Sequence, residues 1–252
     1  MTLSKNRIKY IRSLEQKKNR KADKVFLAEG PKLVGDLLGH FSCQFLLATS
    51  EWLSRNQPLS VTDVTEVSEE ELSRASLLKT PQQVLAVFRQ PDEETDVSVI
   101  SRSLCLALDD VQDPGNLGTI VRLADWFGIE HIFCSPNTVD IYNPKTVQAT
   151  MGGIARVRLH YTPLPELIRS LKDIPVYGTF LDGENMYGQS LSKNGLIVMG
   201  NEGNGIGKEV KSLINRKLYI PNYPASREAA ESLNVAIATA VVCAEFRRQA
   251  AL

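Results

Sequence analysis

Five polar side chains stand out in this sequence, because each lies close to an apolar run typical of a buried strand or helix. They are Asn116 and Arg122 in one block, Glu202 in a second, and Ser232 and Asn234 in a third. Such groups can align a bound substrate, take part in proton transfer, and stabilise a negative charge that develops during a reaction. None of these roles needs a metal ion. The sequence therefore offers candidate residues for a catalytic site.

The second block is a glycine-rich turn, G-N-E-G-N-G-I at residues 200–206. It is not a dinucleotide-binding fingerprint, which has the order G-x-G-x-x-G at the first strand-to-helix turn. It is not a P-loop either, because Glu202 takes the place of the opening glycine and Glu209 that of the final Ser or Thr. Glycines after a strand let a ligand approach the backbone and its N–H groups. The alternative that remains open is a tight turn with no ligand.

Basic residues are concentrated at the start of the chain, although the whole sequence is balanced, with 29 Lys plus Arg and 29 Asp plus Glu. This asymmetry suits a surface that faces phosphates. A solvated helix face is the alternative. The run that we predict to contact phosphates consists of Lys17, Lys18, Arg20 and Lys21.

The four cysteines, Cys43, Cys105, Cys134 and Cys243, are scattered and show no spacing typical of a metal site. Most lie in apolar runs, as reduced core residues of a cytosolic protein do. The first residues lack the apolar stretch of a signal peptide, and no window approaches the ~20 apolar residues of a membrane span. We therefore expect a cytoplasmic protein with no zinc site and no membrane partner.

An acidic stretch at residues 90–96, Q-P-D-E-E-T-D, divides the sequence and is typical of a linker. Before it, we expect a polar helix, a strand at 25–30, an amphipathic helix through Leu38, and strands at 44–48 and 84–89. This order predicts a small α/β domain.

After the linker, apolar strand-like runs alternate with helical stretches, which predicts a mostly parallel sheet with helices on both faces. Ligands of such sheets bind beyond the carboxyl ends of the strands, where all three blocks lie. The expected strands are 104–108, 131–134, 176–180, 196–199 and 217–220, and the expected helices are 118–127, 144–151, 164–171 and 233–249.

The three blocks, D-P-G-N-L-G-T-I-V-R at 113–122, the glycine turn, and E-S-L-N-V-A-I-A at 231–238, occur in an order that identifies a family. They resemble the signature motifs of the SpoU–TrmH branch of the knotted SPOUT RNA methyltransferases. The resemblance is specific over 104–248 and looser over 7–89. It implies a small ribosomal-protein-like α/β RNA-binding domain at 1–90, a linker at 91–98, and a methyltransferase domain with a deep trefoil knot at 99–252.

The resemblance implies an S-adenosylmethionine-dependent enzyme that methylates a ribose 2′-hydroxyl in structured RNA, either rRNA or tRNA. The family works as homodimers, so a dimer through the C-terminal domain is also implied. Two alternatives remain. One is a non-catalytic RNA-binding protein that keeps the fold, against which the intact Asn116, Arg122 and Asn234 argue. The other is a knotted methyltransferase that modifies a base.

The family pattern also implies which residues hold the cofactor, largely through main-chain groups and apolar side chains. That mode of binding explains why the motifs are rich in glycine and aliphatic residues. The residues assigned to S-adenosylmethionine in this way are Thr179, Phe180, Gly200, Asn201, Gly203, Ile220 and Leu233.

The same pattern implies the catalytic roles. Arg122 matches an arginine that is often assigned as general base, but a guanidinium holds its proton too tightly for that role without strong activation. We favour a grip on the target phosphate and stabilisation of the 2′-oxyanion. Asn116 would order the loop around Arg122, and Glu202 would join the active-site network. Ser232 is either catalytic or the N-cap of the final helix. Asn234 would hold the ribose or the arginine.

The sequence departs from the family pattern in three places. Asn222 follows Ile220-Pro221 where methionine is usual, the link at 223–230 is longer than usual, and Ala236 stands where some members have serine. None of these changes removes a proposed catalytic group. The long link leaves the identity of the RNA open.

Overall fold

The computed structural model describes residues 3–57, 59–92, 95–201, 203–224 and 232–251. The chain forms two compact units. The first consists of residues 1–93 together with 140–155, and the second of residues 94–139 together with 156–252. The segment 140–155 thus belongs to the first unit, although the sequence places it inside the predicted methyltransferase domain.

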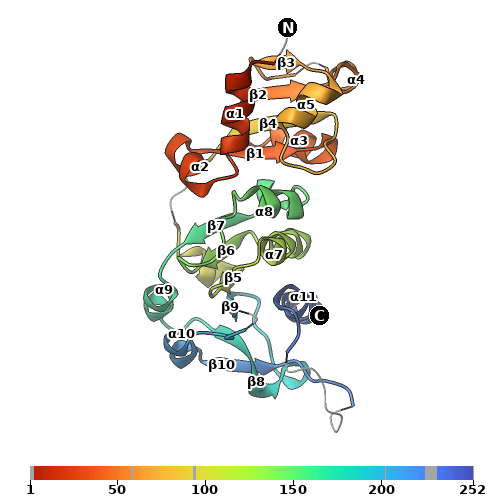
Figure 1. Ribbon diagram of the computed structural model, residues 1–252. Helices are drawn as coiled ribbons and strands as arrows, with labels where there is room; N and C mark the ends of the chain where they lie inside the picture. The colour runs from red at the N-terminus through yellow and green to blue at the C-terminus, as the bar shows by residue number, and fades with distance from the viewer. Residues whose placement is uncertain (1–2, 58, 93–94, 202, 225–231, 252) are drawn as a thin grey trace. The chain divides into compact units, whose positions relative to one another are not determined.

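The first unit is a four-stranded sheet with helices around it (Figure 1). The strand order is β1-β4-β2-β3, with β4 antiparallel to both of its neighbours and β2 parallel to β3. The strands are β1 (Val25–Glu29), β2 (Cys43–Ala48), β3 (Val64–Glu66) and β4 (Val84–Arg89). The helices are α1 (Lys5–Ser13), α2 (Lys17–Asp23), α3 (Pro31–Leu38), α4 (Ser50–Arg55), α5 (Glu69–Ala75) and α8 (Pro144–Ala149), followed by a 3-10 turn at Gly153–Ala155.

The predicted α/β domain is confirmed, with two differences of detail. The polar helix is two helices, because the chain turns at Leu14, whose side chain is buried. The stretch between β2 and β4 contains β3, α4 and α5, which are short and were not expected. Their starts are nevertheless visible in the sequence, since the side chains of Thr49 and Ser68 cap α4 and α5, and Glu71 completes a capping box.

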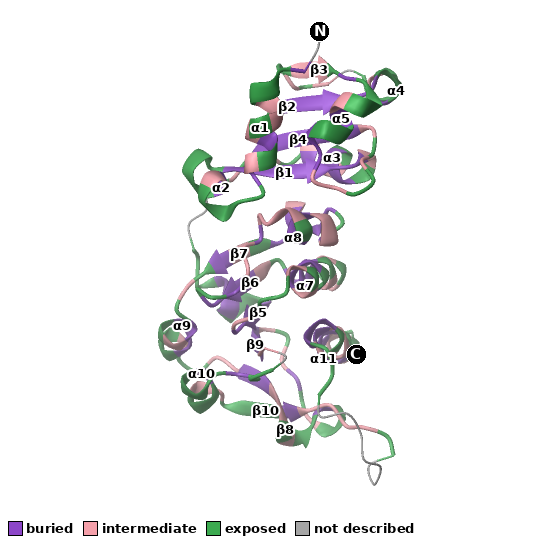
Figure 2. Ribbon diagram, viewed as in Figure 1, coloured by how far each residue is buried: buried purple, intermediate pink, exposed green. Residues whose placement is uncertain are grey.

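The second unit is a six-stranded, fully parallel sheet in the order β10-β8-β9-β5-β6-β7 (Figure 1). Figure 2 shows that the central strands are buried and that the outward faces of the helices are exposed. The strands are β5 (Leu104–Leu108), β6 (His131–Cys134), β7 (Arg158–Tyr161), β8 (Val176–Asn185), β9 (Gly195–Met199) and β10 (Arg216–Tyr219). The helices are α6 (Val99–Arg102), α7 (Pro114–Trp126), α9 (Leu164–Ser170), α10 (Lys208–Leu213) and α11 (Val235–Ala250), with a 3-10 turn at Met186–Gly188.

The expected parallel sheet with helices on both faces is therefore confirmed. The side chain of Val176 joins the core under α9 and α10, whereas Tyr177 packs edge-on against Phe246 of α11, with ring centroids 4.9 Å apart. Neighbouring residues of β8 thus serve opposite layers. Among the described residues, no helix is long and apolar enough to cross a membrane.

Strand β8 contains an arch. Lys217 of β10 pairs with Gly178, but the next residue, Leu218, pairs with Glu184, so residues 179–183 leave the ladder. Gly183 ends the arch, where a Cβ atom would lie 2.5 Å from the carbonyl carbon of Leu218. Only glycine fits such a close approach of two backbones.

A pair of histidines links β6 and β7. Nδ1 of His131 and Nε2 of His160 are 3.0 Å apart, and His160 stacks on Phe133. Burial, together with the neighbouring His131, lowers the pKa of His160 to about 4. The folded protein therefore keeps this imidazole neutral in mildly acidic solution.

The free energy of unfolding should consequently fall as the pH is lowered from about 6.5 to about 4. Over that window the unfolded chain binds a proton at residue 160 that the folded protein does not, which costs up to about 3 kcal/mol. We expect His160→Phe, which keeps the stacking on Phe133, to flatten this dependence in urea titrations at several pH values. An unchanged slope in the variant would assign the acid sensitivity to other groups.

Candidate active site

Two motifs that lie far apart in the sequence meet at one end of the second unit. Nδ2 of Asn234 donates a hydrogen bond to Oδ1 of Asn116, with a distance of 3.0 Å, across a separation of 118 residues. Asn116 lies in the first turn of α7, and Asn234 lies immediately before α11. Two residues that the family pattern assigns to the active site are therefore in hydrogen-bond contact.

Each asparagine is held by the start of its own helix. The carboxylate of Asp113 caps α7 by accepting a hydrogen bond from the backbone N–H of Asn116 at 2.7 Å. Pro114 occupies the first turn of α7, where its missing N–H costs nothing. Oδ1 of Asn234 caps α11 by accepting from the N–H groups of Ala236 and Ile237 at 3.0 and 3.3 Å.

The capping role that the sequence suggested for Ser232 is wrong, because Asn234 fills it. Ser232 lies two residues earlier, in an exposed stretch. Asn234 thus has two functions at once, since its oxygen caps the helix while its N–H reaches Asn116.

These two functions can be separated by substitution. We expect Asn234→Asp to keep the cap, because a carboxylate accepts the same N–H groups and is favoured at a helix N-terminus. It cannot donate to Asn116, so turnover should fall by roughly 10- to 100-fold while the melting temperature stays near that of the parent. Asn234→Ala should lose both functions and about 1 kcal/mol of stability. If Asn234→Asp keeps full turnover, the contact with Asn116 is structural only.

Arg122 lies on the solvent-facing side of α7. It shares this side with Thr119 and Trp126, and the Trp126 side chain is 83% exposed. In the described part of the chain no acidic side chain forms an ion pair with Arg122. Its guanidinium is therefore available to an external phosphate or oxyanion. Glu202, the predicted acidic member of the network, lies outside the described residues.

The glycine turn is closed by its own backbone. Asn201 and Gly205 exchange two backbone hydrogen bonds, of 3.0 and 2.8 Å. Oδ1 of Asn201 accepts from the N–H groups of Gly203 and Asn204. A Cβ atom on Gly200 would lie 2.3 Å from the carbonyl carbon of Gly205, so glycine is required there by the turn itself. Asn201 has a structural role in addition to the cofactor contact expected of it.

Two aspartates that were not predicted from the sequence connect this turn to the end of β5. Oδ2 of Asp109 accepts from the N–H of Gly207 at 2.7 Å, and the carbonyl of Asp110 accepts from Nδ2 of Asn201 at 2.8 Å. Burial raises the pKa of Asp109, and the hydrogen bond from Gly207 opposes that rise. The available signal was an acidic pair directly after the apolar run 104–108.

The arch of β8 places two predicted cofactor residues differently. The hydroxyl of Thr179 lies 3.9 Å from the sulfur of Met199, the residue before Gly200. Phe180 packs against the core under α9 and α10, and the ammonium groups of Lys211 and Lys217 lie 4.9 and 5.4 Å from its ring centroid. Thr179 is thus close to the start of the glycine turn, whereas the Phe180 side chain already has partners of its own.

The remaining predicted cofactor residues lie in turns at the same end of the sheet. Ile220 follows β10 and is half-buried, Leu233 precedes Asn234 and is 49% exposed, and Gly203 is exposed. Main-chain turns with an exposed aliphatic side chain suit a ligand that combines an apolar ring with hydrogen-bonding groups. The residues present therefore fit S-adenosylmethionine.

Comparison with known proteins decides the family. Residues 103–244 match the model of the SpoU rRNA methylase family, and residues 5–86 match an MRM3-like substrate binding domain. The chain belongs to the SpoU rRNA methylase family.

Relatives of this SpoU family protein match along almost the whole chain. It is 31% identical to 23S rRNA (guanosine(2553)-2'-O)-methyltransferase RlmP of Bacillus subtilis, over 96% of each chain. A putative RNA methyltransferase of the TrmH family from Porphyromonas gingivalis is 42% identical, with a TM-score of 0.89 over 99% of this chain and 100% of the other. An AdoMet-bound rRNA methyltransferase from Sinorhizobium meliloti is 31% identical, with a TM-score of 0.84 over 98% and 96% of the two chains.

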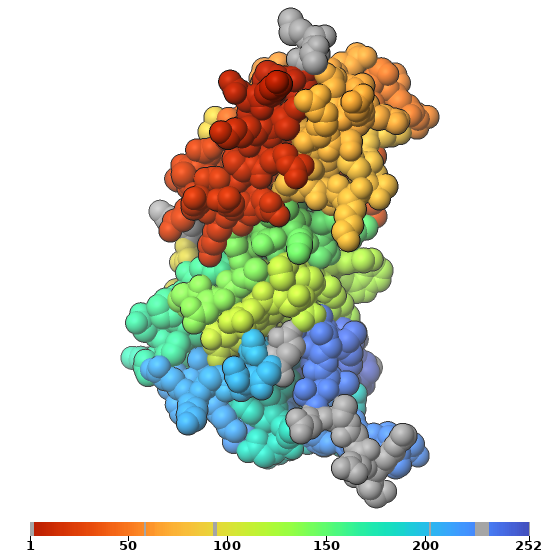
Figure 3. Space-filling model, in the orientation of Figure 1, coloured from red at the N-terminus to blue at the C-terminus, as the bar shows by residue number. Residues whose placement is uncertain are grey.

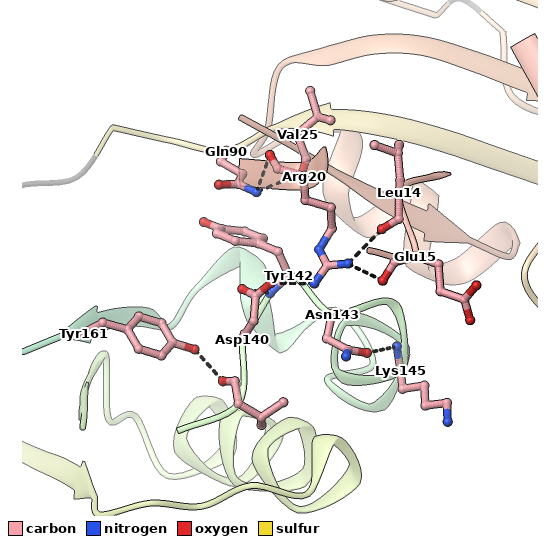
Figure 4. Close-up of polar contacts among 11 residues, drawn as sticks. Leu14, Glu15, Arg20, Val25, Gln90, Asp140, Tyr142, Asn143, Lys145 and Tyr161 are labelled. Carbon is pink, nitrogen blue, oxygen red and sulfur yellow. Dashed lines mark hydrogen bonds and ion pairs between the residues drawn. The ribbon is translucent and has the colours of Figure 1, made fainter. Parts of the chain in front are cut away.

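One of the four basic residues predicted to contact RNA phosphates in this SpoU protein is not at the surface. Lys17, Lys18 and Lys21 are exposed on α2, but Arg20 is buried, with 1% of its surface accessible. Its guanidinium donates to the carbonyls of Leu14 and Glu15 and to the carboxylate of Asp140 (Figure 4). Arg20 is therefore a structural residue and is not available to a phosphate.

Proposed function

We propose that this protein is an S-adenosylmethionine-dependent methyltransferase that acts on a ribose 2′-hydroxyl of structured RNA. The observation that carries the proposal is the hydrogen bond between Asn116 and Asn234, which joins two family motifs at the sheet end that bears the Gly200 turn. The relative from Bacillus subtilis is named for 2′-O-methylation of 23S rRNA, so rRNA is the substrate that we favour over tRNA.

The proposed mechanism follows from the placement of the side chains. S-adenosylmethionine, when bound, supplies an electrophilic methyl group on sulfur. The turns at Gly200, Ile220 and Leu233 would hold it through main-chain groups. The exposed guanidinium of Arg122 would bind the phosphate beside the target ribose and stabilise the negative charge that develops on O2′ as its proton passes to water. We do not assign Arg122 as the base, because a guanidinium keeps its proton at neutral pH.

Asn116 and Asn234 would help to orient the reacting groups. Their mutual hydrogen bond fixes the first turn of α7, and Arg122 projects from the same helix about two turns further on. Holding a nucleophile and an electrophile in line can supply several kcal/mol of the barrier reduction. Glu202 and Ser232 remain proposed members of this network, as their family positions imply.

We also propose a homodimer through the second unit. Helices α7 and α11 contact each other, and their surfaces lie next to each other in Figure 3, in yellow-green and dark blue. Trp126 of α7 is 83% exposed, and Ile237 of α11 is 55% exposed. Large exposed apolar side chains of this kind are typical of protein interfaces. We further propose that the second unit has the trefoil knot of the family. We also propose a cytoplasmic location, where the four unpaired cysteines would stay reduced.

The experiment that tests the proposed function compares 2′-O-methyl sites in total RNA from cells with and without the gene. Alkali cleaves RNA through the 2′-hydroxyl, so a 2′-O-methyl group protects the adjacent phosphodiester. We expect one protected position to be lost when the gene is deleted and restored by the intact gene. A lost base methylation with unchanged alkaline cleavage would support the base-modifying alternative, and an unchanged RNA would support a non-catalytic binding protein.

A further inference from the structure

The segment 140–155 is fastened to the first unit at several points. The carboxylate of Asp140 pairs with Arg20 at 2.6 Å, and the ring of Tyr142 lies 5.0 Å from that of Phe26 in β1. Gly152, which has a φ of +93°, lies so close to α3 that a Cβ atom would be 2.6 Å from Oδ2 of Asp36. A segment that follows β6 in sequence is therefore built into the unit that carries the basic helix α2.

The pair of Arg20 and Asp140 is the charged contact among these fastenings. Their side chains are 2% and 15% exposed, and the guanidinium of Arg20 also donates to two backbone carbonyls between α1 and α2 (Figure 4). A buried charge requires such partners, because it cannot be solvated otherwise. Arg20 thus holds α2, the turn before it, and the start of the segment 140–155 in one arrangement.

The exposed charges around this fastening are mostly positive, although the carboxylates of Glu15 and Asp23 are exposed on the same stretch. Lys17, Lys18 and Lys21 project from α2, and Lys145 is exposed in the first turn of α8. In the parts of the chain that the structure describes, none of these four lysines forms an ion pair. The one acidic residue of the segment 140–155 is Asp140, whose charge Arg20 neutralises.

We infer that the RNA-contacting surface of the first unit is composite. Lys145, from the segment 140–155, binds the RNA phosphate backbone together with Lys17, Lys18 and Lys21 of α2. The Arg20–Asp140 pair holds these two stretches in a fixed position relative to each other. The inference rests on the proposed function, since it names the surface through which the substrate RNA is held. A flexible polyanion such as RNA fits this surface, because exposed lysines on neighbouring elements act as separate point charges that bind separate phosphates.

The first test measures the salt dependence of binding to 23S rRNA transcribed in vitro. Each lost phosphate contact lowers the slope of log affinity against log salt by about one. We expect Lys145→Ala to lower it by about one and the triple substitution of Lys17, Lys18 and Lys21 to lower it further. Lys172→Ala, an exposed lysine in the turn after α9, is the matched control and should leave the slope unchanged. A slope for Lys145→Ala equal to that of Lys172→Ala would overturn the composite surface.

The second test uses Asp140→Asn, with circular dichroism to verify folding. The variant removes a negative charge beside a basic surface, so a pure charge effect would strengthen RNA binding. We expect the opposite, a Kd raised several-fold, because Arg20 loses its charged partner and the two stretches lose their register. Tighter or unchanged binding by the folded variant would refute the positioning role of the pair.

These outcomes are separable from those for the proposed function. Transfer of labelled methyl groups by the parent protein to the same rRNA tests the function alone. If the parent transfers no methyl group while the slopes change as expected, the composite surface stands and the enzymatic proposal falls. If transfer is normal and Lys145→Ala leaves the slope unchanged, the surface falls and the enzymatic proposal stands.

Discussion

Arg122→Ala should lower methyl transfer by about 100- to 1,000-fold while leaving the affinity for S-adenosylmethionine within a few-fold. The reason is the position of the side chain, which is exposed on α7 and has no described acidic partner, so its charge is free to act on the RNA. Isothermal titration with the cofactor and single-turnover transfer to rRNA measure the two quantities on one preparation.

Arg122→Lys is the informative companion variant. It keeps the positive charge but loses the planar fork that binds a phosphate through two parallel hydrogen bonds. Its rate should fall between those of the parent and of Arg122→Ala. Near-normal turnover of Arg122→Ala would remove Arg122 from the proposed mechanism.

Gly200→Ala should abolish tight cofactor binding, because even the smallest side chain collides with the turn. The new Cβ atom would lie 2.3 Å from the carbonyl carbon of Gly205 and 2.4 Å from the nitrogen of Ile206. Both are backbone atoms, so the whole turn must shift. If that overlap costs roughly 3 kcal/mol, cofactor affinity drops by about 100-fold.

Gly188→Ala is the matched control outside this turn. A Cβ atom there would meet no heavy atom within 4 Å, and the residue is exposed. This variant should bind the cofactor nearly as well as the parent. Equal affinities of Gly200→Ala and the parent in calorimetric titration would place the cofactor away from this turn.

The sequence predicted the fold of the second unit well where strands are apolar and long enough to be buried. The runs 104–108 and 131–134 coincide with β5 and β6, because burial on both faces demands continuous apolar residues. Strand β7 escaped prediction since Arg158 and Tyr161 make it mixed in polarity, as its edge position permits. The short helix α10 has too few residues for a periodic pattern to appear.

The site was predictable as far as motif positions determine it. The bond between Asn116 and Asn234 depends on long-range packing that no local pattern contains. The reason for Gly200 was also hidden from the sequence, since the atoms that a side chain there would meet belong to Gly205 and Ile206, later in the same turn. The prediction that Arg20 contacts RNA was wrong for a different reason. Charge alone does not tell an exposed lysine from an arginine in the same run that is buried against Asp140.

The most direct test of the central claim is incubation of the purified protein with unmodified 23S rRNA and S-adenosylmethionine labelled in its methyl group, followed by complete alkaline hydrolysis. We predict that the label appears in alkali-stable dinucleotides with the parent protein and disappears with Arg122→Ala. Label in mononucleotides would show that a base is modified, and would contradict the proposal that the ribose 2′-hydroxyl is the target.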